Sequence, residues 1–385
     1  MFFVLEPLRI GIDARAAVEV PAGRGRVVRE LLRTLSTWPH DDHRYVLLAR
    51  HAWPEPELDE RFHWRLFGAG DPWWHLQAGR TAARECDVLL STNSYVLTLA
   101  ARMPVVTLVY DLATFERSMR PNRRSCAVER LTLGPAVRHS SSLLAISQAT
   151  ADALTGRFRA ARGRTVIAPL GVSPALSNEL TPAEAEQLPD AGFVLAVGTL
   201  EPRKNLPRLV QAYSSLDADL QRRHPLVIVG ALGWETGETL QALRSLGDRC
   251  TMLGYVSDAA LAELYRRCNA FCYPSLGEGF GLPVLEAMAA GAPVVTSHSS
   301  SLPEVGGDAV EYVDPCDVQS IANGLRRVLE DDAHRAELAR RASERAGEFS
   351  WTRFADIALQ ALEGAAGREP SGAGVETVAR PETLV

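Results

Sequence analysis

Apolar residues in the first part of the chain gather in short runs that are separated by amphipathic or polar stretches. These runs are too short for buried helices and lack strict alternation, so they predict strands that are buried on both faces. The run Leu8–Asp13 precedes a glycine-rich loop with Gly23 and Gly25 and then the amphipathic run Val27–Leu35, a pattern that predicts a strand-loop-helix unit. Further strands are expected at Tyr45–Leu48, Val88–Leu90, Val105–Val109, Ser142–Ile146 and Thr165–Ala168.

A second series of the same kind follows a break in the pattern. Pro169–Gly171 and the polar, helix-breaking stretch Pro174–Pro189 predict a linker. Beyond it, strands are expected at Phe193–Val197, Leu226–Val229, Thr251–Leu253, Ala270–Tyr273, Pro293–Thr296 and Ala309–Val313, and helices at Leu206–Ser214, Thr239–Leu246, Asp258–Cys268 and Val318–Leu329. Strands that alternate with helices predict parallel sheets with helices on both faces.

The pattern therefore predicts an α/β chain with two similar domains in tandem. We expect an N-terminal Rossmann-like domain over residues 1–180 and a C-terminal one over residues 181–350. An amphipathic helix over 351–365 and a flexible tail over 366–385 should follow. Ligands bind outside the carboxyl ends of the strands in such sheets, so two facing domains would hold a ligand in the cleft between them.

Length and composition agree with this organisation. A chain of 385 residues suffices for two domains, and 46% hydrophobic with 23% charged residues excludes a disordered or fibrous protein. The longest apolar stretches, Tyr95–Ala101 and Leu226–Leu232, fall short of the roughly 20 residues that a membrane-spanning helix requires. The first residues lack the basic region of a secretory signal, and the six cysteines are too few for a disulfide framework. We therefore expect a cytoplasmic protein.

Charge is distributed unevenly along the chain. Residues 1–180 carry 23 basic and 18 acidic side chains, whereas the remainder carries 18 basic and 29 acidic ones. The basic first part would suit a phosphorylated acceptor or peripheral contact with the inner face of a membrane, but an ordinary solvated surface explains it as well. The same two interpretations apply to the stretch that contains Arg117, Arg120, Arg123, Arg124 and Arg130.

The densest candidate chemistry lies in Glu278–Glu286, directly after an expected strand. Its proline suits the first turn of a helix, so the backbone N–H groups of Gly281 and Leu282 would face an anion. Glu278 on the loop and Glu286 on the first helical turn would accept hydrogen bonds from hydroxyl groups on either side of that anion. Sugar hydroxyls and a ribose fit this layout.

Arg203 and Lys204 follow another expected strand, so a parallel sheet can place them beside Glu278. Lys204 is the single lysine among 41 basic residues, which indicates a site that needs a compact ammonium group. An arginine grips a phosphate with two hydrogen bonds, and a lysine neutralises it as a point charge. The alternative, in which the glycine-rich turn only packs a helix and both carboxylates are solvated, leaves these neighbouring cations unexplained.

Together these motifs resemble the retaining, nucleotide-diphosphosugar-dependent glycosyltransferases of glycosyltransferase family 4. That family has the GT-B architecture: two facing Rossmann-like domains with an inter-domain cleft and a C-terminal crossover helix. The stretch EGFGLPVLEAMAAGAPVV matches the E-x7-E motif of the family, and VLAVGTLEPRKNL matches its diphosphate-binding loop. Weaker matches, which extend the resemblance over residues 8–362, are LGYVSDAALAELYRRCNAFCYPS, IGIDAR, AGRGR, YDL, LLAISQAT and APLGV.

The resemblance implies a role for each matched residue of the donor site. Glu286 would hold the ribose, Glu278 would hold the donor sugar, and Arg203 and Lys204 would clamp the diphosphate. The remaining donor contacts would come from Gly25 on the opposite side, the backbone at Phe280, Gly281 and Leu282, and Tyr255 and Val256 beside the base.

One position departs from the family pattern. Relatives often carry His-Asp after the strand that ends at Val109, whereas this chain has Tyr110 and Asp111. Tyr110 can still donate a hydrogen bond, and Asp111 could orient an acceptor hydroxyl. No nucleophile with a positioned base is evident, so we expect same-face attack in which the departing phosphate takes the acceptor proton. Glu278 as a nucleophile is the minor alternative.

The resemblance implies transfer of a hexosyl group, with GDP-mannose as the favoured donor, to a glycan, lipid-linked or natural-product acceptor. No metal or cofactor is expected, because cations and backbone N–H groups neutralise the diphosphate. The alternative is a sugar-nucleotide epimerase, which shares the two domains but uses no acceptor. A pyridoxal-dependent phosphorylase would need the only lysine for a Schiff base, and a non-catalytic scaffold would not need the intact motifs.

Two weaker signals point to structure rather than to chemistry. Cys268 and Cys272 lack further ligands at zinc-site spacing, so we expect buried thiols. The glycine runs at Gly23 and Gly279 each lack the third glycine of a dinucleotide-binding fingerprint, which argues against NAD.

Overall fold

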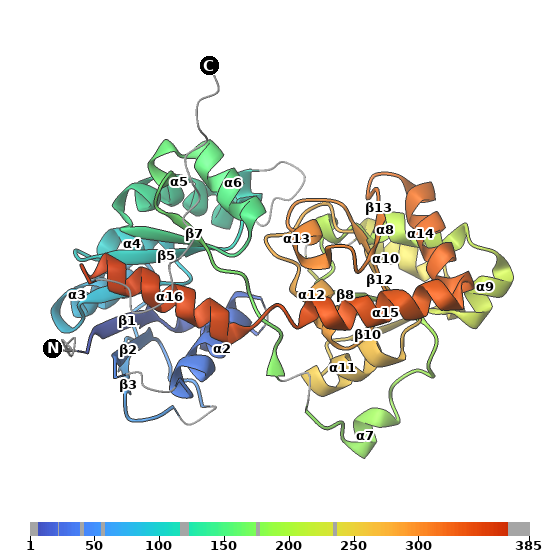
Figure 1. Ribbon diagram of the computed structural model, residues 1–385, viewed down its shortest axis with the longest axis horizontal. Coiled ribbons are helices and arrows are strands. Elements are labelled where there is room, and N and C mark those ends of the chain that lie inside the picture. The colour runs from blue at the N-terminus through green and yellow to red at the C-terminus, as the bar shows by residue number, and fades with distance from the viewer. Residues whose placement is uncertain are drawn as a thin grey trace. The chain divides into compact units, whose positions relative to one another are not determined.

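The computed structural model describes residues 7–21, 23–38, 42–54, 58–115, 123–174, 178–233 and 237–368 (Figure 1). These residues form two compact units. The first contains the chain up to Phe115, Arg123–Gly171 and the helix that begins at Trp351, and the second contains Val172–Ser350. Most of the tail expected over 366–385 lies outside the described residues, as do Arg117 and Arg120.

The first unit contains a parallel sheet of seven strands among its described residues, in the order β3-β2-β1-β4-β5-β6-β7. The strands are β1 (Arg9–Asp13), β2 (Arg44–Ala49), β3 (Phe62–Leu66), β4 (Val88–Ser91), β5 (Val105–Val109), β6 (Ser142–Ala145) and β7 (Thr165–Ile167). The α-helices are α1 (Arg15–Glu19), α2 (Arg24–Ser36), α3 (Trp73–Glu85), α4 (Tyr95–Ala100), α5 (Arg123–His139), α6 (Gln148–Arg157) and α16 (Trp351–Ala365).

The last helix of the chain belongs to the first unit. α16 packs against α2 and the strands β4, β5 and β6, with Phe354, Ala358 and Leu362 buried (Figure 1). His43 and Glu363 form an ion pair of 3.4 Å between the segment before β2 and this helix. The amphipathic run that ends the sequence pattern therefore completes the core of the N-terminal sheet.

Gly25 lies in the first turn of α2, and not in a loop as the sequence predicted. A Cβ atom at this position would stand 1.7 Å from the carbonyl oxygen of Val20 and 2.7 Å from that of Ala16. Only glycine allows α1 and α2 to approach this closely, so this position has a structural requirement of its own.

The second unit contains a parallel sheet of six strands among its described residues, in the order β10-β9-β8-β11-β12-β13. The strands are β8 (Val194–Val197), β9 (Leu226–Val229), β10 (Cys250–Gly254), β11 (Ala270–Tyr273), β12 (Val294–Ser297) and β13 (Glu311–Val313). The α-helices are α7 (Pro182–Ala185), α8 (Leu206–Ser214), α9 (Ala218–Arg223), α10 (Gly237–Arg244), α11 (Asp258–Arg267), α12 (Leu282–Ala289), α13 (Leu302–Gly306), α14 (Val318–Glu330) and α15 (Asp332–Ala346).

Every strand predicted from the sequence is confirmed, with ends that differ by a few residues. One strand and several helices were missed, because their apolar signal is weak. β3 is the edge strand of its sheet and is mostly exposed, while α15 buries little more than Leu338, Ala342 and Ala346 under a largely charged surface. The predicted linker contains the one-turn helix α7, which Thr181 and Glu184 stabilise through a capping box.

Strand order reverses once in each sheet, between β1 and β4 in the first unit and between β8 and β11 in the second. Parallel sheets bind ligands beyond the carboxyl ends of the strands at such a reversal. The residues that follow these four strands are therefore the first places to search for a site. Among the described helices, none has both the length and the apolar composition that a membrane span needs.

Candidate active site

The turn after β8 holds Arg203 and Lys204 at the strand-order reversal of the second unit. It is a single 3₁₀ turn, Pro202–Lys204, followed by Asn205 in the left-handed conformation with φ of 61°. The Asn205 side chain is buried and donates hydrogen bonds to the carbonyl oxygens of Pro274, at 3.0 Å, and Pro315, at 2.7 Å. Asn205 thus ties the cationic turn to the loops after β11 and β13.

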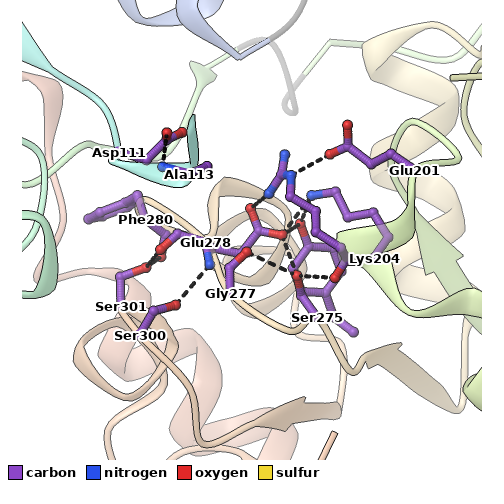
Figure 2. A network of polar contacts seen from close by, with 12 residues as sticks. Asp111, Ala113, Glu201, Lys204, Ser275, Gly277, Glu278, Phe280, Ser300 and Ser301 are labelled. Atoms are coloured by element: carbon purple, nitrogen blue, oxygen red, sulfur yellow. Dashed lines mark hydrogen bonds and ion pairs between the residues drawn. The ribbon is translucent and has the colours of Figure 1, made fainter. Parts of the chain in front are cut away.

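Glu278 lies at the centre of a dense polar network beside this turn (Figure 2). One carboxylate oxygen, Oε1, accepts hydrogen bonds from Lys204 Nζ at 2.8 Å, Ser275 Oγ at 2.7 Å and Tyr273 Oη at 2.8 Å. The other oxygen pairs with the guanidinium of Arg203. The sequence motifs that predicted an anion site therefore meet at one point of the sheet.

The charges of this network balance. Arg203 also pairs with Glu201, so two carboxylates face two cations. Burial by itself would raise the pKa of Glu278, but the charges of Lys204 and Arg203 outweigh it and lower the pKa to about 2. Burial also lowers the pKa of Lys204, against the attraction of Glu278. Since Glu278 stays ionised, Lys204 keeps a compensating negative charge within hydrogen-bond distance.

Tyr273 is a member of this network that the sequence did not single out. Its hydroxyl contacts both Lys204 and Glu278, and its ring stacks on Phe271 and lies 4.7 Å from Lys204 Nζ. The ring is almost completely buried. The tyrosine and Ser275 come from the end of β11 and the residues just after it, so the Tyr-Pro-Ser run before Glu278 was the available signal.

The loop from Glu278 to Gly281 is held by two serines that precede α13. Ser300 Oγ accepts a hydrogen bond from the Glu278 backbone N–H at 2.8 Å, and Ser301 Oγ donates to the carbonyl oxygens of Glu278 and Phe280 at 2.9 Å each (Figure 2). Gly281, with φ of 106°, caps α12. A Cβ atom there would lie 2.7 Å from Leu302, so glycine is needed both for conformation and for space.

Glu286 lies in the second turn of α12, which begins at Leu282, and not in the first turn as predicted. Its side chain is buried and accepts a hydrogen bond of 3.4 Å from the Tyr265 hydroxyl. The helix starts at Leu282 because Gly281 occupies the cap position and Pro283 follows as the second helical residue. The two motif carboxylates are therefore on the loop and inside the helix, respectively.

The other residues predicted for the donor occupy a separate segment. Tyr255 and Val256 directly follow β10 and precede α11. The Tyr255 ring is 71% exposed, and Val256 is half-buried. An exposed aromatic ring at a strand carboxyl end is suited to stacking on a planar ligand.

Tyr110 and Asp111 belong to the first unit, after β5. Tyr110 is buried beneath the guanidinium of Arg24, which lies 5.1 Å from the ring centre, and burial raises the pKa of its hydroxyl. Among the described residues, that hydroxyl has no hydrogen-bond partner. Asp111 accepts a hydrogen bond of 2.9 Å from the Ala113 backbone.

The cysteine prediction is confirmed: Cys268 and Cys272 are buried, and burial raises the pKa of both thiols. Within the described part of the chain, no group of three or more His, Cys, Asp or Glu side chains could hold a metal ion.

Comparison with known proteins identifies the second unit most clearly. Residues 179–346 match the family described as glycosyl transferases group 1. The chain is 37% identical over 255 residues to O-antigen chain mannosyltransferase B of Escherichia coli, covering 64% of this chain and 66% of that protein. It is 33% identical over 291 residues to the serotype-specific mannosyltransferase WbdA of Escherichia coli, covering 70% of this chain and 35% of that one. The chain thus spans less than two thirds of either relative.

Solved structures share the fold over nearly the whole chain. Anabaena HepE, crystallised with UDP and glucose, superposes with a TM-score of 0.72 at 19% identity, covering 93% of this chain and 100% of that one. Sucrose-phosphate synthase from Thermosynechococcus elongatus superposes with a TM-score of 0.71 at 20% identity, covering 92% and 98%. At this identity the likeness concerns the fold alone, and it confirms the predicted GT-B class.

Proposed function

On the premise that residues 179–346 match the group 1 glycosyl transferases, we propose that the chain transfers a hexosyl group from a nucleoside-diphosphate sugar to an acceptor hydroxyl. The observation that carries the proposal is the arrangement of Arg203 and Lys204 around Glu278 at the strand-order reversal of the second sheet. Two cations anchored by buried hydrogen bonds suit the diphosphate of such a donor.

The favoured donor is GDP-mannose. The two relatives described above are named mannosyltransferases, which supports a mannosyl donor for this chain. Glu286, buried in α12, would hold the ribose hydroxyls, and the exposed Tyr255 with Val256 would flank the base. Glu278 and the backbone at Phe280, Gly281 and Leu282 would hold the donor sugar.

The reaction would proceed with retention at the anomeric carbon. As the bond between that carbon and the diphosphate oxygen breaks, negative charge develops on the leaving group, and Arg203 and Lys204 stabilise it. The acceptor oxygen attacks the same face and its proton passes to the departing phosphate, so no separate nucleophile is required. Binding of the diphosphate would draw Arg203 away from Glu278 and free one carboxylate oxygen for a sugar hydroxyl.

We assign acceptor binding to the N-terminal domain, residues 1–180, and donor binding to residues 181–350. Tyr110 would donate a hydrogen bond near the reacting sugar, Asp111 would orient the acceptor hydroxyl, and Gly25 would approach the diphosphate. Peripheral contact of the basic first domain with a membrane remains part of this proposal. The comparisons offer no support for the epimerase alternative, because the proteins described above are transferases and synthases.

The test is a donor and acceptor screen with the full chain. GDP-, UDP-, dTDP- and ADP-sugars are incubated with neutral mannosides, and nucleotide release is measured with and without acceptor. We expect acceptor-dependent release of GDP and a product whose anomeric proton shows the configuration of the donor. Nucleotide-sugar conversion without any acceptor would instead establish the epimerase.

A further inference from the structure

Buried polar atoms without a hydrogen-bond partner are concentrated at the strand-order reversal of the first unit. Among the described residues, eleven buried side-chain nitrogen or oxygen atoms lack such a partner. Five of them belong to one neighbourhood, namely Asp13 Oδ2, Arg15 Nε, Arg50 Nε, Trp74 Nε1 and His75 Nδ1. Two of these five still have a carboxylate oxygen within ion-pair distance, Arg15 Nε that of Glu19 at 3.8 Å and His75 Nδ1 that of Asp71 at 3.4 Å. Folded proteins satisfy nearly all buried polar groups, so a local cluster of exceptions points to a ligand or to bound water.

Four of these residues form one polar network with Glu19 and Asp71. We call this network the β1–α3 cluster: Asp13, Arg15, Glu19, Arg50, Asp71 and His75. Asp71 Oδ1 accepts hydrogen bonds from Arg15 at 3.1 Å and from Arg50 at 3.0 Å. Arg50 also contacts Glu19 at 3.4 Å. Asp13 ends β1, Arg50 follows β2, and Asp71 and His75 flank the start of α3. The cluster therefore lies beyond the carboxyl ends of β1 and β2, next to the start of α3.

The cluster has a buried floor and an accessible rim. The side chains of Arg15 and His75 are only 8% and 6% exposed, and His75 Nε2 is fixed by Ser94 Oγ, after β4, at 2.9 Å. Asp71, by contrast, is 53% exposed. Two residues further on, Trp73 at the start of α3 presents an indole that is 65% exposed.

The composition of the rim selects a class of ligand. The guanidinium of Arg50 is balanced by Glu19 and Asp71, so the rim offers no excess positive charge to an anion. It offers carboxylate acceptors and guanidinium donors side by side, and a sugar hydroxyl, which both donates and accepts, can use the two together. An exposed indole supplies the flat apolar surface on which the apolar face of a sugar ring can rest.

We propose that the β1–α3 cluster, with Trp73, is a binding subsite for an uncharged sugar residue of the acceptor. This inference rests on the proposed glycosyl transfer and specifies the chemistry of its acceptor: a neutral glycan end and not a phosphorylated one. Asp71 and Arg50 hold the hydroxyl groups, Trp73 covers one face of the ring, and Arg15 and His75 act as positioning residues behind Asp71.

The test compares Asp71→Asn and Trp73→Ala with two surface controls of the same unit, Asp152→Asn on α6 and Leu131→Ala on α5. Leu131 is 75% exposed, so its removal mimics the loss of an exposed apolar side chain. Saturation-transfer NMR measures binding of α-1,3-mannobiose as the neutral probe and of mannose 6-phosphate as the anionic probe. Thermal stabilisation by GDP is measured on the same samples as an independent readout of the donor site.

We expect the neutral disaccharide to bind the wild-type chain and both controls, and its affinity to fall about tenfold in Asp71→Asn and Trp73→Ala. In steady-state transfer the same two variants should raise the acceptor KM about tenfold and leave the donor KM and kcat within twofold. Preference for mannose 6-phosphate, or equal binding of mannobiose by all five proteins, would overturn the subsite while GDP still stabilises the chain. Absence of GDP stabilisation in the wild-type chain would count against the proposed GDP-sugar donor and not against the subsite.

Discussion

The two strand-order reversals of this molecule carry opposite kinds of polar site. At β8 and β11 in the second unit, Glu278 receives hydrogen bonds from three side chains on one oxygen and an ion pair on the other. At β1 and β4 in the first unit, Asp13 is fully buried but one carboxylate oxygen lacks a hydrogen bond, and four neighbouring nitrogen atoms lack one too.

This difference agrees with the ligands that we propose for the two sites. A diphosphate carries concentrated charge and needs cations whose positions are set in advance, which the ion pairs of the second unit would supply. A sugar carries no charge and needs donors and acceptors that remain available. The electrostatics reflect the same contrast: the neighbouring cations lower the pKa of Glu278 to about 2, whereas burial, only partly offset by Arg15, raises the pKa of Asp13 to about 6.

The largest expected effect comes from substitutions that disturb the charged network of Arg203, Lys204 and Glu278 in the second unit. Lys204→Ala should lower kcat about 100–1000-fold, because the developing diphosphate charge loses one of two side-chain counter-ions. Lys204→Arg keeps the charge but replaces a compact ammonium by a planar fork beside Arg203, and should lose about 10–100-fold. Steady-state transfer is measured beside Arg222→Ala, which removes an exposed cation from α9. Activity of Lys204→Arg within twofold of wild type would show that the single lysine has no special role.

The next effect concerns the contribution of Glu278, at the strand-order reversal of the second unit, to the free energy of unfolding. The folded pKa of Glu278 lies below its ordinary value of 4.5, so its ionised form contributes stability above that value and the contribution is lost as the pH falls toward 2. The shift corresponds to about 3 kcal/mol. Glu278→Gln should lower the free energy of unfolding at pH 7 by up to about this amount, and the deficit should shrink below pH 4. Urea titrations of both proteins across this range provide the measurement, and a deficit that does not depend on pH would count against the ion pairs.

At the strand-order reversal of the first unit, the free energy of unfolding should depend on pH in the opposite direction. The folded pKa of Asp13 is raised from 3.8 to about 6, mainly by burial, so ionisation costs stability above pH 6 and nothing below about pH 4. Asp13→Asn should therefore raise the free energy of unfolding at pH 8 by up to about 3 kcal/mol and leave it unchanged at pH 4. The same urea titrations measure it. A variant that is less stable than wild type at pH 8 would mean that Arg15 outweighs burial at this site.

A smaller effect distinguishes the roles that we propose for Glu286 and Glu278. Glu286→Ala should weaken GDP binding about tenfold through lost ribose contacts, equivalent to about 1.4 kcal/mol. Glu278→Ala should instead lower turnover with the donor sugar. The diagnostic probe is 2′-deoxy-GDP, measured by calorimetry: wild type should discriminate against it, and Glu286→Ala should bind GDP and 2′-deoxy-GDP alike. Retained discrimination in the variant would place the ribose elsewhere.

The smallest expected effect concerns metals. In the proposed mechanism Arg203, Lys204 and backbone N–H groups neutralise the diphosphate, so transfer in excess EDTA should stay within twofold of the untreated rate. If EDTA abolished transfer and Mg²⁺ or Mn²⁺ restored it, a metal cation would supply part of the charge that neutralises the diphosphate. The contrast between the two strand-order reversals would then be weaker.

Much of the candidate site could be predicted from the sequence. The strands before Arg203 and before Glu278 have strong apolar signals, and ligand-facing loops must follow the carboxyl ends of parallel strands. The helix begins early enough, at Leu282, that Glu286 falls in its second turn and not in the first as predicted, because the cap position depends on the backbone conformation of Gly281. Tyr273, Asn205 and Ser300 went unrecognised, since each contacts a residue that is distant in sequence, respectively Lys204, Pro315 and Glu278.

The sequence by itself determined the alternation of strands and helices, the two-domain organisation and the residue types of the proposed diphosphate site. These depend on local apolar periodicity and on motifs within a few residues of one another. Only the tertiary structure decided that Arg203 and Lys204 pair with Glu278, that Gly25 serves the packing of α1 on α2, and that Asp13, Arg50 and Asp71 meet at one sheet edge. Such contacts are decided by strand order and burial, because these bring distant side chains together and determine which of them can reach a hydrogen-bond partner.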